Sequence, residues 1–382
     1  MSAPYDASMD AMDGGSLVPA PHVARPLRLL PFRAIRLTPS RIGSPASLRA
    51  FSRPDDDAAS RLDRWERRGY LSRDTGPAIY LHEYTADGLS VRGLVGALDI
   101  ARRASTRESA AVHPHEGIHA DQVTELADLM TVMQTQPAPI LLVHRGPQAL
   151  RELLDKVQTG EPLQDYTDRA GQRHRVWAVR EPAALEEVER SLADSTAVIA
   201  DGHHRYAAYL RMHHGQPTPA TAAGLAMLVD QDDTPLHLGA IHRTVSGTNL
   251  GAVQAAAEGL GADWSATDHD GAMGALARTT LVLTDGRDWM TVRVPDGSRP
   301  AVDWLHGELL PRLGTAVRVR YHHHADGALG AARRGTLAVL MPAPDFDQVL
   351  EASACGHLLP EKATSFQPKP NVGGFIRALR DG

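Results

Sequence analysis

The stretch "VIADGHHRYAAYLRMHHG", residues 198–215, places a short apolar run directly before four polar residues and a helical pattern. The apolar run over 196–200 predicts a strand, and 204–214 predicts a helix. The first N–H groups of a helix have no partner within the helix, and the helix dipole adds partial positive charge there. Such an end binds phosphate readily, so the stretch predicts a phosphate-binding turn between a strand and a helix.

The residues at this turn are suited to phosphoryl chemistry. Gly202 allows the backbone to approach a ligand or to take a positive φ. Arg205 can donate two parallel hydrogen bonds to phosphate oxygens, and His203 and His204 can donate hydrogen bonds or exchange protons near neutral pH. Asp201 can hold Mg²⁺ or accept a proton from a hydroxyl nucleophile. The alternative is an Asp201 helix cap followed by solvated side chains. The four polar residues in this order favour the phosphate interpretation.

A second cluster lies upstream, in "VHPHEGIHADQVTELADLM", residues 112–130. His115-Glu116 ends a strand-like run, and the spacing of apolar residues predicts an amphipathic helix over 120–133. Glu116 is therefore placed as a candidate general base or metal ligand. A solvated glutamate in a loop is the alternative.

A third segment, "LLPEKATSFQPKPNVGGF" at 358–375, places lysines and hydroxyls ahead of a glycine pair. Lys362, Ser365 and Lys369 are candidate phosphate ligands there, because cations and hydroxyls can close over phosphate oxygens. An ordinary basic loop is the alternative.

Composition narrows the class of protein. The chain has 382 residues, with 42% hydrophobic and 23% charged residues, as in a globular protein of one large or two smaller domains. The net charge of −6 provides no overall basic field, so nucleic acid is not an expected partner. The single cysteine excludes an intramolecular disulfide and a cysteine-based zinc cluster. It predicts a cytoplasmic protein, and no apolar run is long enough to predict a membrane span.

The order of elements predicts a mixed α/β chain of the α+β class. Residues 1–25 are small and acidic and lack the features of a signal peptide, so we expect a disordered tail. Two strand-like runs within 77–100, joined by Asp87-Gly88, predict a hairpin. A core over 26–215, with an insert at about 146–193, and a C-terminal α/β region over 216–382 are the predicted divisions.

Taken together, these segments resemble known families. "HE" before a helix of the type "xxVxxLAxxM", then "PAPILLV", then "VIADGHHRYAA", resembles the core of the ParB/sulfiredoxin-like fold, which includes ParB-type nucleotide-binding domains, sulfiredoxins and free-serine kinases. Nearly the whole chain resembles a bacterial family of uncharacterised proteins that contain an ADGHHRY segment. The resemblance extends to "LLPFRAIR", "PAIYLHEYTADGLSVRGLVGAL", "EPLQDYTDRAGQRHRVWAV" and "LLPEKATSFQPKPNVGGFI". It implies a ParB/sulfiredoxin-like core with an added N-terminal region and a C-terminal α/β region.

The resemblance also implies roles for individual residues. His204 and Arg205 match the phosphate-binding histidine and arginine of sulfiredoxins. His203 stands where their reactive cysteine would be, so thiol chemistry is unavailable. Glu116 and Asp201 match carboxylates of the free-serine kinases, where the upstream glutamate is the proposed base. One departure is Gly117-Ile118-His119, where the ADGHHRY family usually has a Thr-Arg-Pro run.

The function that this resemblance implies is phosphoryl transfer from ATP or ADP, with Mg²⁺, to a small hydroxyl-bearing metabolite such as free serine. Catalysis is assigned to Glu116, Asp201 and His203, with Asp201 also as the Mg²⁺ ligand. Phosphate binding is assigned to the remaining candidates: Gly202, His204, Arg205, Lys362, Ser365 and Lys369. A ParB-like nucleotide-binding switch with slow hydrolysis and a phosphatase are the alternatives, and a homodimer is compatible with each.

Overall fold

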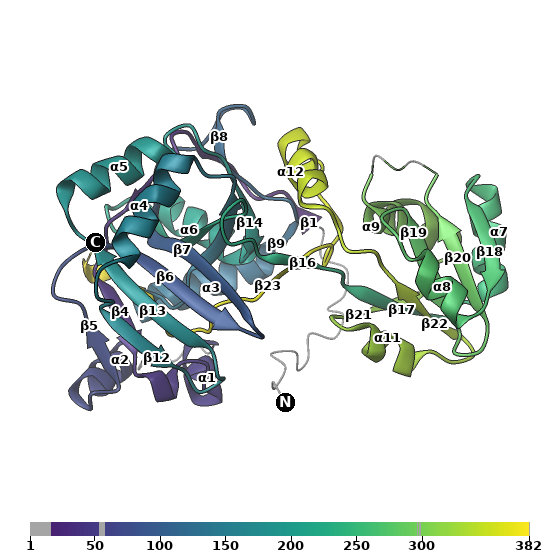
Figure 1. Ribbon diagram of the computed structural model, residues 1–382, viewed down its shortest axis with the longest axis horizontal. Helices are drawn as coiled ribbons and strands as arrows, with labels where there is room; N and C mark the ends of the chain where they lie inside the picture. The colour runs from purple at the N-terminus through teal and green to yellow at the C-terminus, as the bar shows by residue number, and fades with distance from the viewer. Residues whose placement is uncertain (1–16, 53–57, 296, 298, 382) are drawn as a thin grey trace. The chain divides into compact units, whose positions relative to one another are not determined.

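The chain folds into two compact units. The structure is a computed structural model that describes residues 17–52, 58–295, 297 and 299–381. Unit 1 comprises residues 1–236 and 368–382, and unit 2 comprises residues 237–367. The mixed α/β class is confirmed, since helices alternate with strands in both units (Figure 1). The first unit ends at 236 instead of 215, and the chain returns to it after unit 2.

Unit 1 is built on a mixed sheet of ten strands among the described residues. Its centre is antiparallel, except that β11 runs parallel to β15 and β14 runs parallel to β8. The strand that follows the predicted phosphate-binding helix, β15, lies in the middle of this sheet, which is why unit 1 extends past residue 215. In order across the sheet, the strands are β12 (Gln164–Thr167), β13 (Arg173–Val179), β6 (Ile79–Ala86), β7 (Leu89–Asp99), β15 (Ala223–Asp230), β11 (Ile140–His144), β14 (Ala197–Asp201), β8 (Ala110–His113) and β2 (Val23–Ala24), with β3 (Leu29–Leu30) paired to β7.

The β6–β7 hairpin shows how the sequence sets the two faces of this sheet. Its turn is the predicted Asp87-Gly88 pair, and both residues take a positive φ, as a tight hairpin turn requires. Side chains alternate along β6: Ile79 and Leu81 join the main apolar core cluster. Tyr80, His82 and Tyr84 point to the opposite face and are buried there.

The main core joins one face of the sheet to the helices of unit 1. Apolar residues of several helices pack into one cluster with residues of β6, β7, β11 and β14. The predicted amphipathic helix is confirmed as α3, which contributes Val123, Met130 and Met133 to this core. The helices of unit 1 are α1 (Pro45–Ser52), α2 (Ala58–Arg67), α3 (Ala120–Met133), α4 (Gln148–Gln158), α5 (Pro182–Leu192) and α6 (His203–Gly215), with short 3-10 turns at η1 (Pro39–Arg41) and η3 (Leu379–Asp381).

Two smaller sheets complete unit 1 and bring distant segments together. The C-terminal strand β24 (Ile376–Ala378) pairs with β4 (Ala34–Leu37) near the start of the chain (Figure 1). The other members of that sheet are β5 (Leu71–Arg73) and β10 (Thr135–Gln136). A two-stranded sheet pairs β1 (Leu17–Val18) with β9 (Ile118–His119).

The expected disordered tail differs from the structure over residues 17–25. These residues contain β1 and β2, and Ala20 and Val23 are buried. The reason is that Val23 pairs with β8 and its N–H donates to the Tyr206 hydroxyl at 3.0 Å, so this segment has partners from distant parts of the chain. The remainder of the predicted tail, residues 1–16, lies outside the described residues.

Unit 2 has its own six-stranded sheet in the order β18-β20-β19-β22-β17-β21. A small core of Ala272, Val282, Ala328, Ala338 and Leu340 joins this sheet to its helices. The strands are β16 (His237–Gly239), β17 (His242–Ser246), β18 (Asp263–Thr267), β19 (Thr280–Thr284), β20 (Trp289–Arg293), β21 (Arg318–His322), β22 (Thr336–Leu340) and β23 (Ser365–Gln367), of which β16 pairs with β23. The helices are α7 (Leu250–Gly259), α8 (His269–Ala275), α9 (Ala301–Trp304), the π-helical turn η2 (Leu305–Leu309), α10 (Leu310–Arg312), α11 (Ala325–Ala331) and α12 (Phe346–Cys355).

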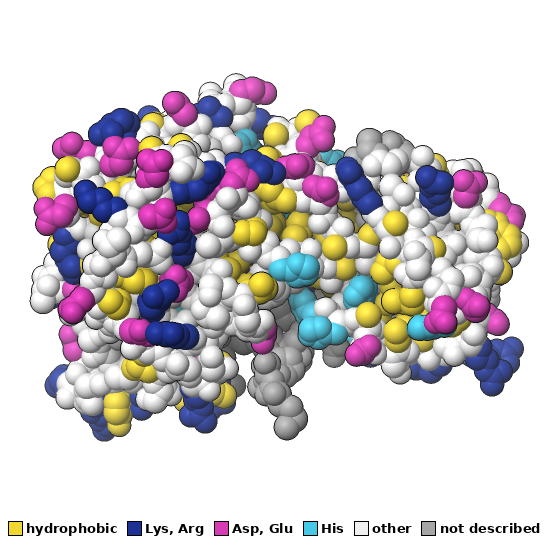
Figure 2. Space-filling view, viewed as in Figure 1, with side chains coloured by type: hydrophobic (Ala, Val, Ile, Leu, Met, Phe, Trp, Pro, Cys, Tyr) yellow, Lys and Arg dark blue, Asp and Glu magenta, His cyan; other side chains and the backbone are white. Residues whose placement is uncertain are grey.

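The surface carries charges of both signs. On the face shown in Figure 2, Lys and Arg side chains are interspersed with Asp and Glu over unit 1. Within the described residues, no helix combines the length and the apolar character needed to cross a membrane.

Candidate functional site

The predicted strand–turn–helix junction is present in unit 1. Strand β14 ends at Asp201, and α6 begins at His203 after Gly202, which is the helix N-cap residue. Gly202 has φ +93° and ψ 33°, a left-handed conformation that an L side chain disfavours. A Cβ at this position would also lie 3.0 Å from Arg205 Nη2 and 3.1 Å from Ile140 Cγ2. The glycine therefore allows both the turn and the approach of the Arg205 guanidinium to the backbone.

Gly202→Ala should lower the free energy of unfolding by about 1–2 kcal/mol, because the left-handed conformation is unfavourable for alanine. Gly215→Ala is the matched control, since Gly215 ends the same helix and an added Cβ there would meet no atom within 4 Å. Urea titration of both variants checks the difference. Equal stabilities would contradict the left-handed turn.

Two cations hold the Asp201 carboxylate. Arg205 Nη2 donates to Oδ2 at 2.5 Å, and Lys369 Nζ donates to Oδ1 at 2.5 Å. Arg205 Nη1 also donates to the Pro139 carbonyl at 2.6 Å, which fixes the plane of the guanidinium. Burial opposes ionisation of the carboxyl, but the charges of Arg205 and Lys369 outweigh it and lower the pKa of Asp201 to about 2. The group is therefore one anion between two cations and carries a net positive charge.

Glu116 lies beside the first residue of α6. Its Oε2 is 3.9 Å from His203 Nδ1, and its Oε1 is 3.7 Å from His115 Nε2. The His115 N–H donates to His203 Nε2 at 3.5 Å, so a neutral His203 carries its proton on Nδ1, toward Glu116. Burial lowers the pKa of both histidines, to about 3 for His115 and well below its ordinary value for His203. Neutral imidazoles therefore flank the carboxylate, whose side chain is 19% exposed.

The departure at residues 117–119 has a structural role next to this group. Ile118 and His119 form β9, and His119 is the N-cap residue of α3. The His119 N–H donates to His204 Nε2 at 3.0 Å, and the two rings are stacked with centroids 5.8 Å apart. A neutral His204 accepting this bond carries its proton on Nδ1. His119 thus orients His204 through this hydrogen bond and the stacking of the two rings.

The structure brings most of the predicted site residues together. Glu116 comes from the segment before α3, and Lys369 from the segment that re-enters unit 1 after unit 2. Asp201, Gly202, His203, His204 and Arg205 come from the β14–α6 junction. Lys362 and Ser365 belong to unit 2, where Ser365 is buried in β23 and the Lys362 carbonyl accepts a hydrogen bond from Arg243. Phosphate binding by Lys362 and Ser365 stays a prediction.

The arrangement around Asp201 does not fit the predicted Mg²⁺. Each carboxylate oxygen already accepts a hydrogen bond from a cation, and a divalent ion there would face two like charges. Among the described residues, no group of three or more His, Cys, Asp and Glu side chains is arranged to hold a metal ion. Asp201 is equally unsuited as a proton acceptor, because its pKa lies near 2.

Sequence reasoning missed the residues that hold Lys369 in place. The Gln172 side chain donates to the Lys369 carbonyl at 3.0 Å and accepts from the Asn371 N–H at 3.2 Å. Asp168 accepts a hydrogen bond from Asn371 Nδ2 at 2.6 Å. These contacts join residues about 200 positions apart in the chain, so no local pattern in the sequence indicated them.

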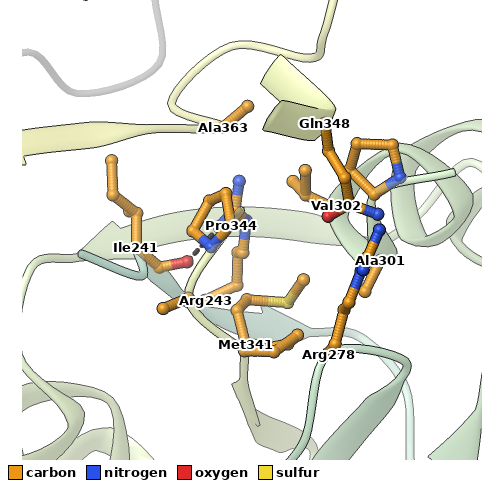
Figure 3. A pocket seen from close by; sticks show the side chains of 12 residues that line it. Ile241, Arg243, Arg278, Ala301, Val302, Met341, Pro344, Gln348 and Ala363 are labelled. Carbon is orange, nitrogen blue, oxygen red and sulfur yellow. Dashed lines mark hydrogen bonds between the residues drawn. The ribbon is translucent and has the colours of Figure 1, made fainter. Parts of the chain in front are cut away.

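Unit 2 contains a separate pocket, lined by residues that include two arginines (Figure 3). Arg243 is fully buried, and its guanidinium donates to the carbonyls of Ile241 and, at 2.8 Å, Lys362. Gln348, with its amide oxygen turned toward Arg278, accepts from Nε at 3.1 Å and from Nη2 at 2.9 Å. Both arginines of the pocket thus bond to other groups of unit 2 and hold its strands and loops together. We therefore take the β14–α6 junction, and not this pocket, as the candidate site.

Comparison with known proteins gives one family and several distant structures. A free serine kinase in complex with AMP has a TM-score of 0.40 at 12% identity, covering 76% of this chain and 94% of that one. SbnI with a C-terminal truncation, from Staphylococcus aureus, has a TM-score of 0.43 at 9% identity over 71% and 85% of the two chains. A conserved hypothetical protein from Pyrococcus furiosus has a TM-score of 0.38 at 14% identity over 71% and 93%.

No curated protein matches the chain. Residues 27–319 match the family described as "Protein of unknown function (DUF1015)". This match extends from the first strands of unit 1, through the β14–α6 junction, into unit 2. The chain therefore belongs to the DUF1015 family.

Proposed function

We propose that the protein is a nucleotide-dependent phosphotransferase that phosphorylates a small hydroxyl-bearing metabolite. The observation that carries the proposal is a carboxylate next to a net positive group at a helix N-terminus. The Glu116 carboxylate lies 3.9 Å from the ring of His203. His203 is two positions along the chain from Asp201 and from Arg205, which form the positive group with Lys369. The sequence motifs suggest the phosphoryl donor, ATP or ADP, with free serine as an example of the acceptor.

Phosphate binding is assigned to the N-terminal turn of α6 and its cations. The Tyr206 N–H donates to the Gly202 carbonyl at 2.8 Å, so the N–H groups before it precede the first helical hydrogen bond. Arg205 and Lys369 each use some of their donors on Asp201 and keep others, since a guanidinium has five N–H donors and an ammonium has three. Asp201 positions both cations instead of binding metal or accepting a proton.

Glu116 is assigned as the general base. It accepts the proton of the substrate hydroxyl, and that oxygen attacks the terminal phosphorus of the nucleotide. The new P–O bond forms as the bond from phosphorus to the bridging oxygen breaks, and the nucleotide leaves with one phosphate fewer. His203 is assigned a place beside the base, with its Nδ1 facing Glu116 at 3.9 Å, a role that follows from its burial and differs from direct phosphate contact.

The proposal is tested by incubating the purified protein with ATP or ADP, Mg²⁺ and a panel of hydroxy amino acids, followed by ³¹P NMR. The expected result is a new phosphomonoester signal that requires both nucleotide and acceptor. Nucleotide hydrolysis with a change of oligomeric state and no phosphorylated product would indicate the nucleotide-binding switch. Phosphate release from a monoester without nucleotide would indicate a phosphatase, and the absence of nucleotide binding would end the proposal.

A further inference from the structure

A chain of buried side chains links the β12–β13 hairpin to the segment that carries Lys369. Asp168 Oδ2 accepts a hydrogen bond from His174 Nε2 at 3.1 Å, and His174 Nδ1 lies 2.9 Å from His82 Nε2. The two imidazoles are stacked with an interplanar angle of 10°. All three side chains are buried, and the function proposed above uses none of them. We refer to Asp168, His174 and His82 as the relay.

The polarity of the relay follows from its hydrogen bonds. Because His174 Nε2 faces a carboxylate, it carries the proton, and Nδ1 then accepts from the Nε2–H of His82. Burial and the neighbouring His174 lower the pKa of His82 well below its ordinary value, so its ring is neutral. The relay is therefore an ordered series of donors that ends on the carboxylate of Asp168.

Asp168 is the point at which the relay meets the returning segment. Its Oδ1 accepts the backbone N–H groups of Ala170 and Gln172, each at 2.9 Å, which closes the hairpin turn. Its Oδ2 accepts both His174 Nε2 and Asn371 Nδ2. Four donors converge on this carboxylate, two on each oxygen. An asparagine here would therefore place its NH₂ group, which is itself a donor, against two other donors.

The returning segment is held on both sides of Lys369. Tyr84 donates to the Pro368 carbonyl at 2.6 Å, one residue before the lysine. Gln172 holds the Lys369 carbonyl and the Asn371 N–H, as described above. Phe375 packs edge-on against His82 with centroids 5.2 Å apart. The backbone of this segment is thus fixed by the face of the sheet that bears the relay.

We propose that Asp168, with the relay behind it, is a positioning residue that holds the segment 368–375 so that the Lys369 ammonium reaches Asp201. The Lys369 side chain is 43% exposed and long, and its own contact with Asp201 fixes only the end of it. Holding the backbone on both sides reduces the conformational entropy that the ammonium loses on pairing. That Lys369 matters for catalysis rests on the proposed function. That Asp168 holds Lys369 in place does not depend on it.

The composition of the chain makes the test direct, because it has only three lysines, Lys156, Lys362 and Lys369. The protein is treated with an acetylating reagent, and the rate of acetylation of each lysine is followed by mass spectrometry. Lys156 is exposed on α4 and serves as the internal reference. Asp168→Asn should raise the acetylation rate at Lys369 relative to Lys156 by about threefold to tenfold, as expected when the net contribution of one typical hydrogen bond is lost.

Asp165→Asn is the matched control, since Asp165 lies in the same hairpin and pairs with Arg173 at the surface. It should leave the rate at Lys369 unchanged. An unchanged rate in a folded Asp168→Asn protein would overturn the proposal. If that variant does not fold, Asn371→Ala decides in the same way, because it removes the hydrogen bond between Asp168 and the segment at a partly exposed side chain.

A double-mutant cycle separates positioning from general destabilisation. With ATP as the ligand, Asp168→Asn should weaken binding in the wild-type background and have little further effect in Lys369→Met. Additive losses would contradict an action through Lys369. If the wild-type protein binds no nucleotide, the proposed function fails, while the labelling rates still decide whether Asp168 positions the lysine.

Discussion

Glu116→Gln is expected to abolish most phosphoryl transfer while leaving nucleotide affinity unchanged. The amide has nearly the shape of the carboxylate but cannot accept the hydroxyl proton, and loss of a general base costs about 10²–10⁴-fold in rate. Glu116 is 19% exposed, so it is accessible to a substrate as well as to the neutral His115 and His203. The measurement is the turnover rate by ³¹P NMR, together with the dissociation constant for ATP by calorimetry.

The control for this variant is Glu125→Gln, which removes a carboxylate from an exposed position on α3, the helix that follows Glu116. It should retain wild-type turnover. A Glu116→Gln protein with normal turnover would show that the proton goes elsewhere. A protein that lost nucleotide affinity and turnover together would assign Glu116 to binding.

Arg205→Met is expected to weaken nucleotide binding by about 10- to 150-fold, which corresponds to about 1.5–3 kcal/mol for the loss of a hydrogen bond to a charged group. The variant keeps the apolar stem of the side chain but removes the donors that face Asp201 and the Pro139 carbonyl. It also removes one of the two cations of the group, which leaves Asp201 and Lys369 as a neutral pair. Calorimetry with ATP measures the effect.

Arg211→Met provides the comparison on the same helix, because Arg211 is exposed on α6 and lies two turns from the N-terminus. It should bind nucleotide as the wild type does. Equal affinities for both variants and the wild type would remove the phosphate-binding role of the junction. Thermal unfolding should accompany the titrations, since Arg205 also ties β14 to the loop before β11.

The local structure of the candidate site was predictable from the sequence because its determinants are local. An apolar run, a glycine and a helical pattern fix β14, the turn and α6, and the positive φ of Gly202 is what a glycine at such a turn permits. The Asp87-Gly88 hairpin and the amphipathic α3 followed in the same way from residues close together in the chain. In each case the spacing of apolar residues along the chain, or the residues of the turn, is sufficient to specify the helix or strand.

The roles of two site residues were not predictable from the same pattern. Asp201 was assigned to Mg²⁺ or to proton transfer, but Lys369 reaches it from 168 positions away and, with Arg205, keeps it ionised and occupied. His203 was assigned to phosphate contact or catalysis, but it is buried against His115 and faces Glu116. A sequence gives the type of a side chain, whereas its partners decide its charge and direction.

By itself, the sequence determined the mixed α/β class, the strand–turn–helix junction with its cations and the presence of a carboxylate ahead of α3. Only the tertiary structure decided that Glu116 lies against this junction and that a segment beyond unit 2 returns to supply Lys369. It also joined Asp168, His174 and His82 beneath that segment. The physical reason is that these contacts join segments far apart in the chain, and the packing of the whole unit sets how those segments meet.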